Sequence, residues 1–159
     1  MPRKKRVYKN KRYLKPDPKF GNLAIAKFIN AIMLDGKKST AQRIMYTALD
    51  IISEQTKNDP LLVFDTALRN VAPVLEVKAR RIGGANYQIA IEVRPERRDT
   101  LSMRWLREAA RNRGGHTMAE KLAAELIAAS KKEGGAMKKR EDVHRMAESN
   151  RAFSHFLQS

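Results

Sequence analysis

Residues 74–94 read VLEVKARRIGGANYQIAIEVR, and this stretch decides the fold. Apolar and polar residues alternate on both sides of Gly83-Gly84, which is the period of a β-strand, and paired glycines are typical of a tight turn. The stretch therefore predicts a β-hairpin at about 74–94, with Arg80 and Arg81 at its tip. Because an isolated hairpin is only marginally stable in water, we expect its base to pack on the rest of the chain and its tip to project.

Helical periodicity fills the sequence on both sides of this hairpin. Apolar residues recur at i, i+3, i+4 and i+7 in three segments before it and three after it. The expected starts of these segments lie at about Asn22, Ser39, Asp59, Glu96 or Asp99, Thr117 and just beyond Gly135. The first segment is expected to end in a left-handed turn at Asp35-Gly36. The sequence thus predicts a mainly α fold, a single domain of six helices with the β-hairpin inserted between the third and fourth.

The first twenty residues have a different composition. Residues 1–20 hold nine Lys or Arg and one Asp, a net charge of +8, with three prolines and few apolar residues. Such a segment cannot offset its ordering entropy by burial. We expect a basic disordered N-terminal arm over 1–20 that orders on a partner, followed by a helical domain over 21–159. The alternative is a tail that only keeps the protein in solution.

The charge of the whole chain indicates the class of partner. The 159 residues include 33 Lys or Arg and 17 Asp or Glu, which gives a net charge of +16 and attraction to polyanions. No apolar run approaches the length that spans a bilayer, and no amphipathic helix near the terminus pairs basic with bulky apolar faces, so we expect no membrane partner. The absence of cysteine excludes disulfides and cysteine-based zinc sites, and it fits a reducing cytoplasm.

Catalytic patterns are missing from the sequence. His116, His144 and His155 lie far apart and show no metal-ligand spacing. Neither a nucleophile elbow nor a phosphate-cradling glycine loop is present. We therefore expect no enzyme activity, no cofactor and no metal.

Binding patterns are more abundant. Gly36-Lys37-Lys38 precedes the second helix, where two lysines beside free N–H groups and the positive end of the helix dipole suit a phosphate. Its alternative interpretation is a helix end with solvated charges. At the hairpin tip, Arg80-Arg81-Ile82-Gly83-Gly84 offers two guanidiniums that can bind phosphate bidentately or stack on bases. The alternative there is a charged end that prevents edge-to-edge strand pairing.

A third basic element follows the hairpin. Arg94, Arg97 and Arg98 lie at the entry to the fourth helix, and Arg104, Arg107, Arg111 and Arg113 continue along it. Trp105 among them is interpreted as a core residue rather than a base-stacking platform. Readers of duplex DNA usually present one element to one groove, whereas folded RNA offers phosphates on several converging helices. The spread of basic elements therefore favours RNA.

Long stretches of the chain are also motifs of one protein family. They lie at 28–38, 41–44, 74–88, 92–98, 104–106, 138–142 and 146–153. Over nearly the whole chain, these motifs closely resemble the bacterial form of the small-subunit ribosomal protein seven family. The sequence departs from the family at Ala90, where many members have proline, in the longer and more basic first twenty residues, and at its end, 156–159.

The resemblance implies a structural constituent of the small ribosomal subunit in the cytoplasm. It implies a primary rRNA-binding protein that nucleates assembly of the head, near the exit-site tRNA and the mRNA exit, beside other small-subunit proteins. Some members repress their own mRNA. A rival hypothesis is an architectural DNA-binding protein with a basic β-arm.

The site residues are expected on two surfaces. Those expected to bind rRNA are Arg3, Lys4, Lys5, Arg6, Lys37, Lys38, Arg80, Arg81, Arg94, Arg97, Arg98, Arg111 and Arg113. Those expected near exit-site tRNA and mRNA are Arg81, Ile82, Gly83, Gly84, Lys138, Lys139 and Arg140.

Overall fold

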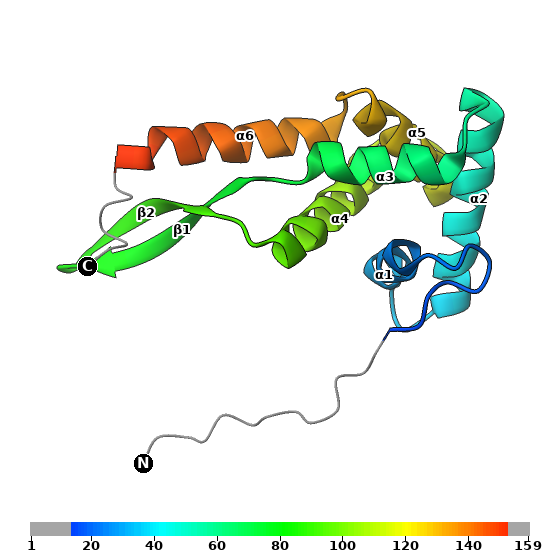
Figure 1. Ribbon diagram of the computed structural model, residues 1–159, viewed down its shortest axis with the longest axis horizontal. Coiled ribbons are helices and arrows are strands. Elements are labelled where there is room, and N and C mark those ends of the chain that lie inside the picture. The colour runs from blue at the N-terminus through cyan, green and yellow to red at the C-terminus, as the bar shows by residue number, and fades with distance from the viewer. Residues whose placement is uncertain (1–13, 153–159) are drawn as a thin grey trace, which may run out of the picture.

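The computed structural model describes residues 14–152, and in this range the chain forms six helices and one hairpin (Figure 1). In chain order the elements are α1 (Leu23–Ile32), α2 (Lys38–Thr56), α3 (Pro60–Val71), β1 (Leu75–Ile82), β2 (Ala85–Glu92), α4 (Pro95–Asn112), α5 (Met118–Ser130) and α6 (Gly135–Ser149). The predicted mainly α fold, with a hairpin between the third and fourth helices, is confirmed.

Local capping residues start three of the helices, as the sequence predicted. The side chain of Asn22 accepts hydrogen bonds from the N–H groups of Ala24 and Ile25 at 2.7 and 3.3 Å. Asp59 accepts from Leu61 at 3.0 Å, and Thr117 accepts from Glu120 at 3.3 Å. Each cap satisfies backbone donors that have no partner inside the helix.

Two helix boundaries differ from the expectation. α1 ends at Ile32, earlier than the expected stop at Asp35-Gly36, although those two residues do form a left-handed turn with φ of 51° and 70°. α4 begins at Pro95, because the fixed φ of proline suits the first position of a helix.

The core lies between the helices and is centred on α5, which packs against α2, α3, α4 and α6. The rings of Phe28 and Phe64 are fully buried and meet edge to face, with centroids 5.4 Å apart. Burying each such side chain contributes roughly 1.5–3 kcal/mol. Trp105 is only 7% exposed, which confirms its interpretation as a core residue.

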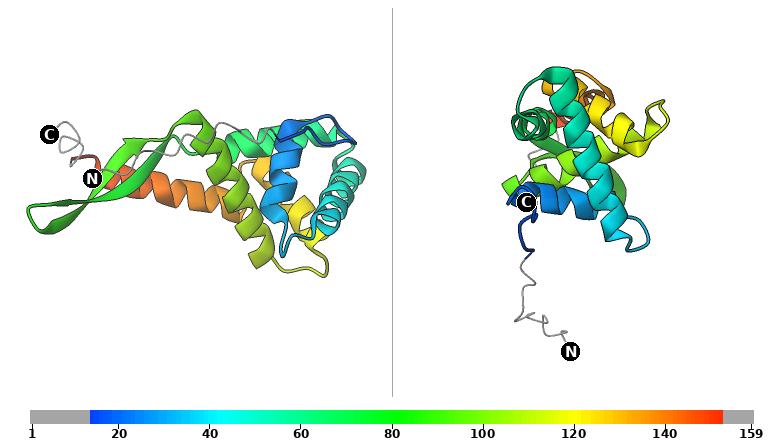
Figure 2. Two further views of the ribbon diagram at one scale, coloured as in Figure 1. Left: turned by 90° about the horizontal axis from the view of Figure 1, so that it is seen from below. Right: turned by 90° about the vertical axis from the view of Figure 1, so that its right-hand side faces the viewer.

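The hairpin leaves the helical body alongside α6 (Figure 2). Its register pairs Leu75 with Glu92 at the base and Ile82 with Ala85 at the turn. Because α6 packs against both strands, the part of the hairpin near the body is anchored, and Ile89 is fully buried. The tip extends beyond the helices, as the sequence predicted.

The end of the predicted arm folds onto α2. Asp17 is 3% exposed, accepts the N–H groups of Lys19 and Phe20 at 3.1 Å each, and accepts the hydroxyl of Tyr46 at 2.6 Å. Burial and the neighbouring Asp17 raise the pKa of Tyr46 to about 12. The body thus begins several residues before the expected boundary at residue 20, because one buried carboxylate collects these donors. Residues 1–13, with Arg3, Lys4, Lys5 and Arg6, lie outside the described residues.

Candidate nucleic-acid interface

The hairpin tip presents the two predicted arginines. Arg80 lies directly across the ladder from Tyr87, and Arg81 from Asn86, and both arginines are exposed. The turn beyond Ile82 is made by Gly83 and Gly84 with φ of 57° and 88°, a left-handed conformation that disfavours other residues. The tip is therefore narrow, with two guanidiniums just behind a turn free of side chains.

At the base of the hairpin, ion pairs tie the strands to α4. Nε of Arg97 lies 2.8 and 2.9 Å from the two carboxylate oxygens of Glu76, and its Nη2 lies 2.8 Å from Oε2. The hydrogen bond and the charge of Glu76 raise the pKa of Arg97 further above its ordinary value. Nε of Arg98 donates to the carbonyl of Val93 at 2.8 Å, and its Nη2 to Glu92 at 3.0 Å.

Beside these pairs, the surface is hollowed. The hollow measures about 620 Å³ and is lined by Glu76, Val77, Lys78, Ile91, Glu92, Arg94 and Arg97. Three of these residues are cations, and all three are exposed. The structure therefore brings together the predicted residues Arg94, Arg97 and Arg98, and adds Lys78 and Glu76, which sequence reasoning did not select.

The second predicted element, at the start of α2, lies at the opposite end of the molecule from the hairpin (Figure 1). Lys37 and Lys38 are exposed. Their own N–H groups bond within the turn, to Leu34 at 2.9 Å and Gly36 at 2.8 Å. The N–H groups of the following first turn have no acceptor inside the helix, so the phosphate site predicted here stays a prediction.

Along α4, several arginines make contacts inside the protein. Arg107 donates to the carbonyl of Ala31 at 3.1 Å, and Arg111 to that of Ile32 at 3.3 Å, so both satisfy the carboxyl end of α1. Arg113 donates to the buried Glu125 through Nε at 3.1 Å and Nη2 at 2.9 Å. The rRNA contacts predicted for Arg111 and Arg113 remain predictions, and both side chains also have structural partners.

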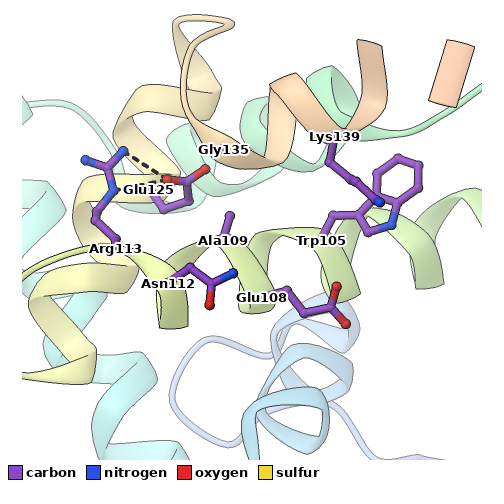
Figure 3. A pocket seen from close by; sticks show the side chains of 8 residues that line it. All are labelled: Trp105, Glu108, Ala109, Asn112, Arg113, Glu125, Gly135 and Lys139. Carbon is purple, nitrogen blue, oxygen red and sulfur yellow. Dashed lines mark hydrogen bonds and ion pairs between the residues drawn. The ribbon is translucent and has the colours of Figure 1, made fainter. Parts of the chain in front are cut away.

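Glu125 holds the junction of three helices. It is 1% exposed, and besides Arg113 it accepts the N–H of Ala136 at 2.9 Å, at the start of α6. A Cβ at Gly134 would lie 2.8 Å from its carboxylate, so glycine is required there. Figure 3 shows this pair at one end of an open hollow of about 480 Å³, with Trp105 and Lys139 at the other end.

On α6 the three predicted cations divide into two kinds. Lys138 and Lys139 are exposed, whereas Arg140 is partly buried and donates to the carbonyl of Asn70 at 2.7 Å. Nearer the hairpin, Nε2 of His144 accepts the N–H of Val74 at 3.0 Å. Burial, and then Arg140, lower the pKa of His144. Neutral His144 therefore ties the hairpin base to α6.

The basic surface of the described residues is suited to bind polyanions. A helical body holds the base of a basic hairpin through packing and ion pairs, and further cations line a hollow beside it. Within residues 14–152, no group of acidic or histidine side chains could hold a metal ion, and no helix could cross a membrane.

Comparison with known proteins gives the family. Residues 2–151 match the family described as Ribosomal protein S7p/S5e. Proteins called Small ribosomal subunit protein uS7 from Teredinibacter turnerae and Polynucleobacter necessarius subsp. necessarius are 61% and 60% identical over 156 residues, covering 98% of this chain and 99% of each relative. The one from Cupriavidus necator is also 60% identical over 156 residues. The chain belongs to the ribosomal protein S7p/S5e family, and the resemblance predicted from the motifs is confirmed.

Proposed function

We propose that this chain is a structural constituent of the small ribosomal subunit and binds rRNA with its hairpin and basic helix surfaces. The observation that carries the proposal is the basic hairpin, whose base packs on α6 and is joined to α4 by ion pairs, and whose tip projects. The relatives, which are named as small ribosomal subunit proteins, support the same role and a place in the cytoplasmic ribosome. A ribosomal family also favours a structural role over a catalytic one.

The finer role that we propose is that of a primary rRNA binder that nucleates assembly of the subunit head. The cations at the two ends of the molecule support it, because a protein that contacts phosphates at distant points can hold separate rRNA helices together. The projecting tip, with Arg81, Gly83 and Gly84, is suited to reach exit-site tRNA and mRNA. Lys138 and Lys139 on α6 are also proposed to lie near exit-site tRNA and mRNA.

Stepwise reconstitution tests this role. The chain is added alone to rRNA of the subunit head, and the rRNA is then probed for protection before and after the other small-subunit proteins are added. We expect protection by this chain alone, and poor incorporation of head proteins when it is omitted. Binding that requires other proteins to be present first would contradict a primary role.

A further inference from the structure

The base of the hairpin holds an ion pair with an unusual division of exposure. The side chain of Glu76, on β1, is only 16% exposed, whereas that of its partner Arg97, in the first turn of α4, is 57% exposed. If Glu76 served to shield the charge of Arg97 from a ligand, its carboxylate would have to cover the solvent-facing side of the guanidinium. Instead, the protein covers most of the Glu76 side chain, and more than half of the Arg97 side chain stays exposed.

The bonding pattern leaves part of the guanidinium available. Glu76 engages Nε and Nη2, and Nη1 takes part in none of these bonds. A guanidinium held by two nitrogens on one edge is fixed in position and in plane, and its remaining N–H groups are directed away from the carboxylate. Such an arginine loses less side-chain entropy when it binds a further oxygen.

The position of this guanidinium indicates what it binds. Arg97 lines the hollow of about 620 Å³ together with the cations Lys78 and Arg94. Glu76 and Glu92 also line the hollow, so its three cations leave a net charge of +1, and Glu92 is in turn paired with Arg98. This excess of cations attracts an anion, and phosphate oxygens match the fork of an arginine. Since Glu76 neutralises part of the positive charge around the hollow, attraction of an anion alone does not explain the presence of a carboxylate at this position.

We propose that Glu76 is a positioning residue, which holds the guanidinium of Arg97 at the edge of this hollow to receive one backbone phosphate of folded RNA. This inference rests on the proposed rRNA-binding function and deepens it. A folded RNA holds each phosphate at one place, so a guanidinium that is already fixed can match it. A duplex offers many equivalent phosphates along its length, so a mobile guanidinium binds it equally well. Glu76 thereby increases the preference for folded RNA over duplex DNA.

The test is the variant Glu76→Gln, which removes a negative charge and weakens the interaction that fixes the guanidinium of Arg97. Dissociation constants are measured for an rRNA head fragment and for duplex DNA at one salt concentration. The control is Glu96→Gln, which removes the same charge from an exposed position next to Arg97. General electrostatics predicts that both variants bind every polyanion slightly more tightly. We expect E76Q instead to bind the rRNA fragment about tenfold more weakly, with no loss of affinity for DNA.

A result in which E76Q tightens binding to both nucleic acids, as E96Q does, would overturn the proposal. If the wild-type chain itself fails to prefer the rRNA fragment, the proposed function fails, and the two failures are therefore distinguishable.

A second variant separates positioning from a purely structural role. Arg97→Lys keeps the charge and removes the fork, and we expect it to weaken rRNA binding as E76Q does, with thermal unfolding unchanged within a few degrees. The double variant E76Q/R97K should be no weaker than either single variant, because both remove the same fixed guanidinium. Additive losses would show that Glu76 acts through another group and would overturn the proposal. Should E76Q disturb the hairpin, R97K alone must still show the selective loss.

Discussion

Single buried carboxylates organise the protein at two places. Asp17 collects two backbone donors and the hydroxyl of Tyr46, and Glu125 collects the guanidinium of Arg113 and the start of α6. A buried charge is stable only when its hydrogen-bonding capacity is filled, so removing it leaves several polar groups unsatisfied at once.

Substitution of Glu125 by alanine leaves the guanidinium of Arg113 and the N–H of Ala136 without their hydrogen-bond acceptor. We expect Glu125→Ala to lower the free energy of unfolding by about 2–4 kcal/mol, a range reduced for the partial exposure of Arg113. Urea titration measures the change. The exposed Glu133, close by in the chain, is the control, and its alanine variant should stay within about 0.5 kcal/mol of wild type. Equal stabilities for the two variants would contradict this account of the junction.

Tyr46 gives a pH signature. Its pKa is about 12 in the folded state and about 10 when unfolded, so the folded state holds the proton more tightly. Its contribution is fully present below pH 10 and is lost as pH rises toward 12. We expect the free energy of unfolding to fall more steeply over this range in wild type than in Tyr46→Phe. If the free energy of unfolding depends on pH in the same way in both proteins, the hydroxyl of Tyr46 does not stabilise the fold through its hydrogen bond to Asp17.

At the scale of the elements, the sequence predicted what is local and missed what is distant. The helix caps at Asn22 and Asp59 and the turn at Gly83-Gly84 depend on neighbouring residues, so their patterns could be read directly. The partners of Arg97 and Arg111 lie 21 and 79 residues away, and no local pattern indicates them. In the sequence, Glu76 is therefore only one of the polar residues that alternate along a predicted strand.

The contact between α6 and the hairpin should respond to acid. The pKa of His144 is lowered by burial, so the folded state favours the neutral ring that accepts the N–H of Val74. Its stabilising effect is present above about pH 6.5 and is lost as pH falls through the lowered pKa. Between pH 7 and 5, wild type should lose more unfolding free energy than His144→Gln. His116→Gln, at an exposed histidine, should behave as wild type; if it instead matches His144→Gln, the assignment is wrong.

The hairpin tip is predicted to add charge contacts without supporting the fold. Since Arg80 and Arg81 are exposed, Arg80→Ala/Arg81→Ala should leave the circular dichroism spectrum and the melting temperature almost unchanged. Each lost phosphate contact should reduce the slope of log affinity against log salt by about 0.7–0.9. Arg43→Ala/Lys131→Ala removes the same charge from exposed sites on the helical body. Identical slopes for the two double variants would exclude the tip from the interface.

At the scale of the whole molecule, the helical body acts as a support for separated basic elements. The core around α5 fixes the position of α4 and α6. In turn, α6 packs against both strands of the hairpin, and Arg97 and Arg98 of α4 hold its base through ion pairs. Rigid spacing between cations is useful for a partner whose phosphates have fixed positions, which is the property of a folded RNA. A protein that bound through its net charge alone would bind any polyanion.

The central claim is therefore a preference for folded rRNA over other nucleic acids. It is tested most directly by titrating the full chain into an rRNA head fragment, in competition with excess tRNA and duplex DNA, across a series of salt concentrations. We predict that tight binding to the fragment survives both competitors at moderate salt. If all three nucleic acids compete equally and binding collapses together as salt rises, the protein binds charge rather than shape, and the account is contradicted.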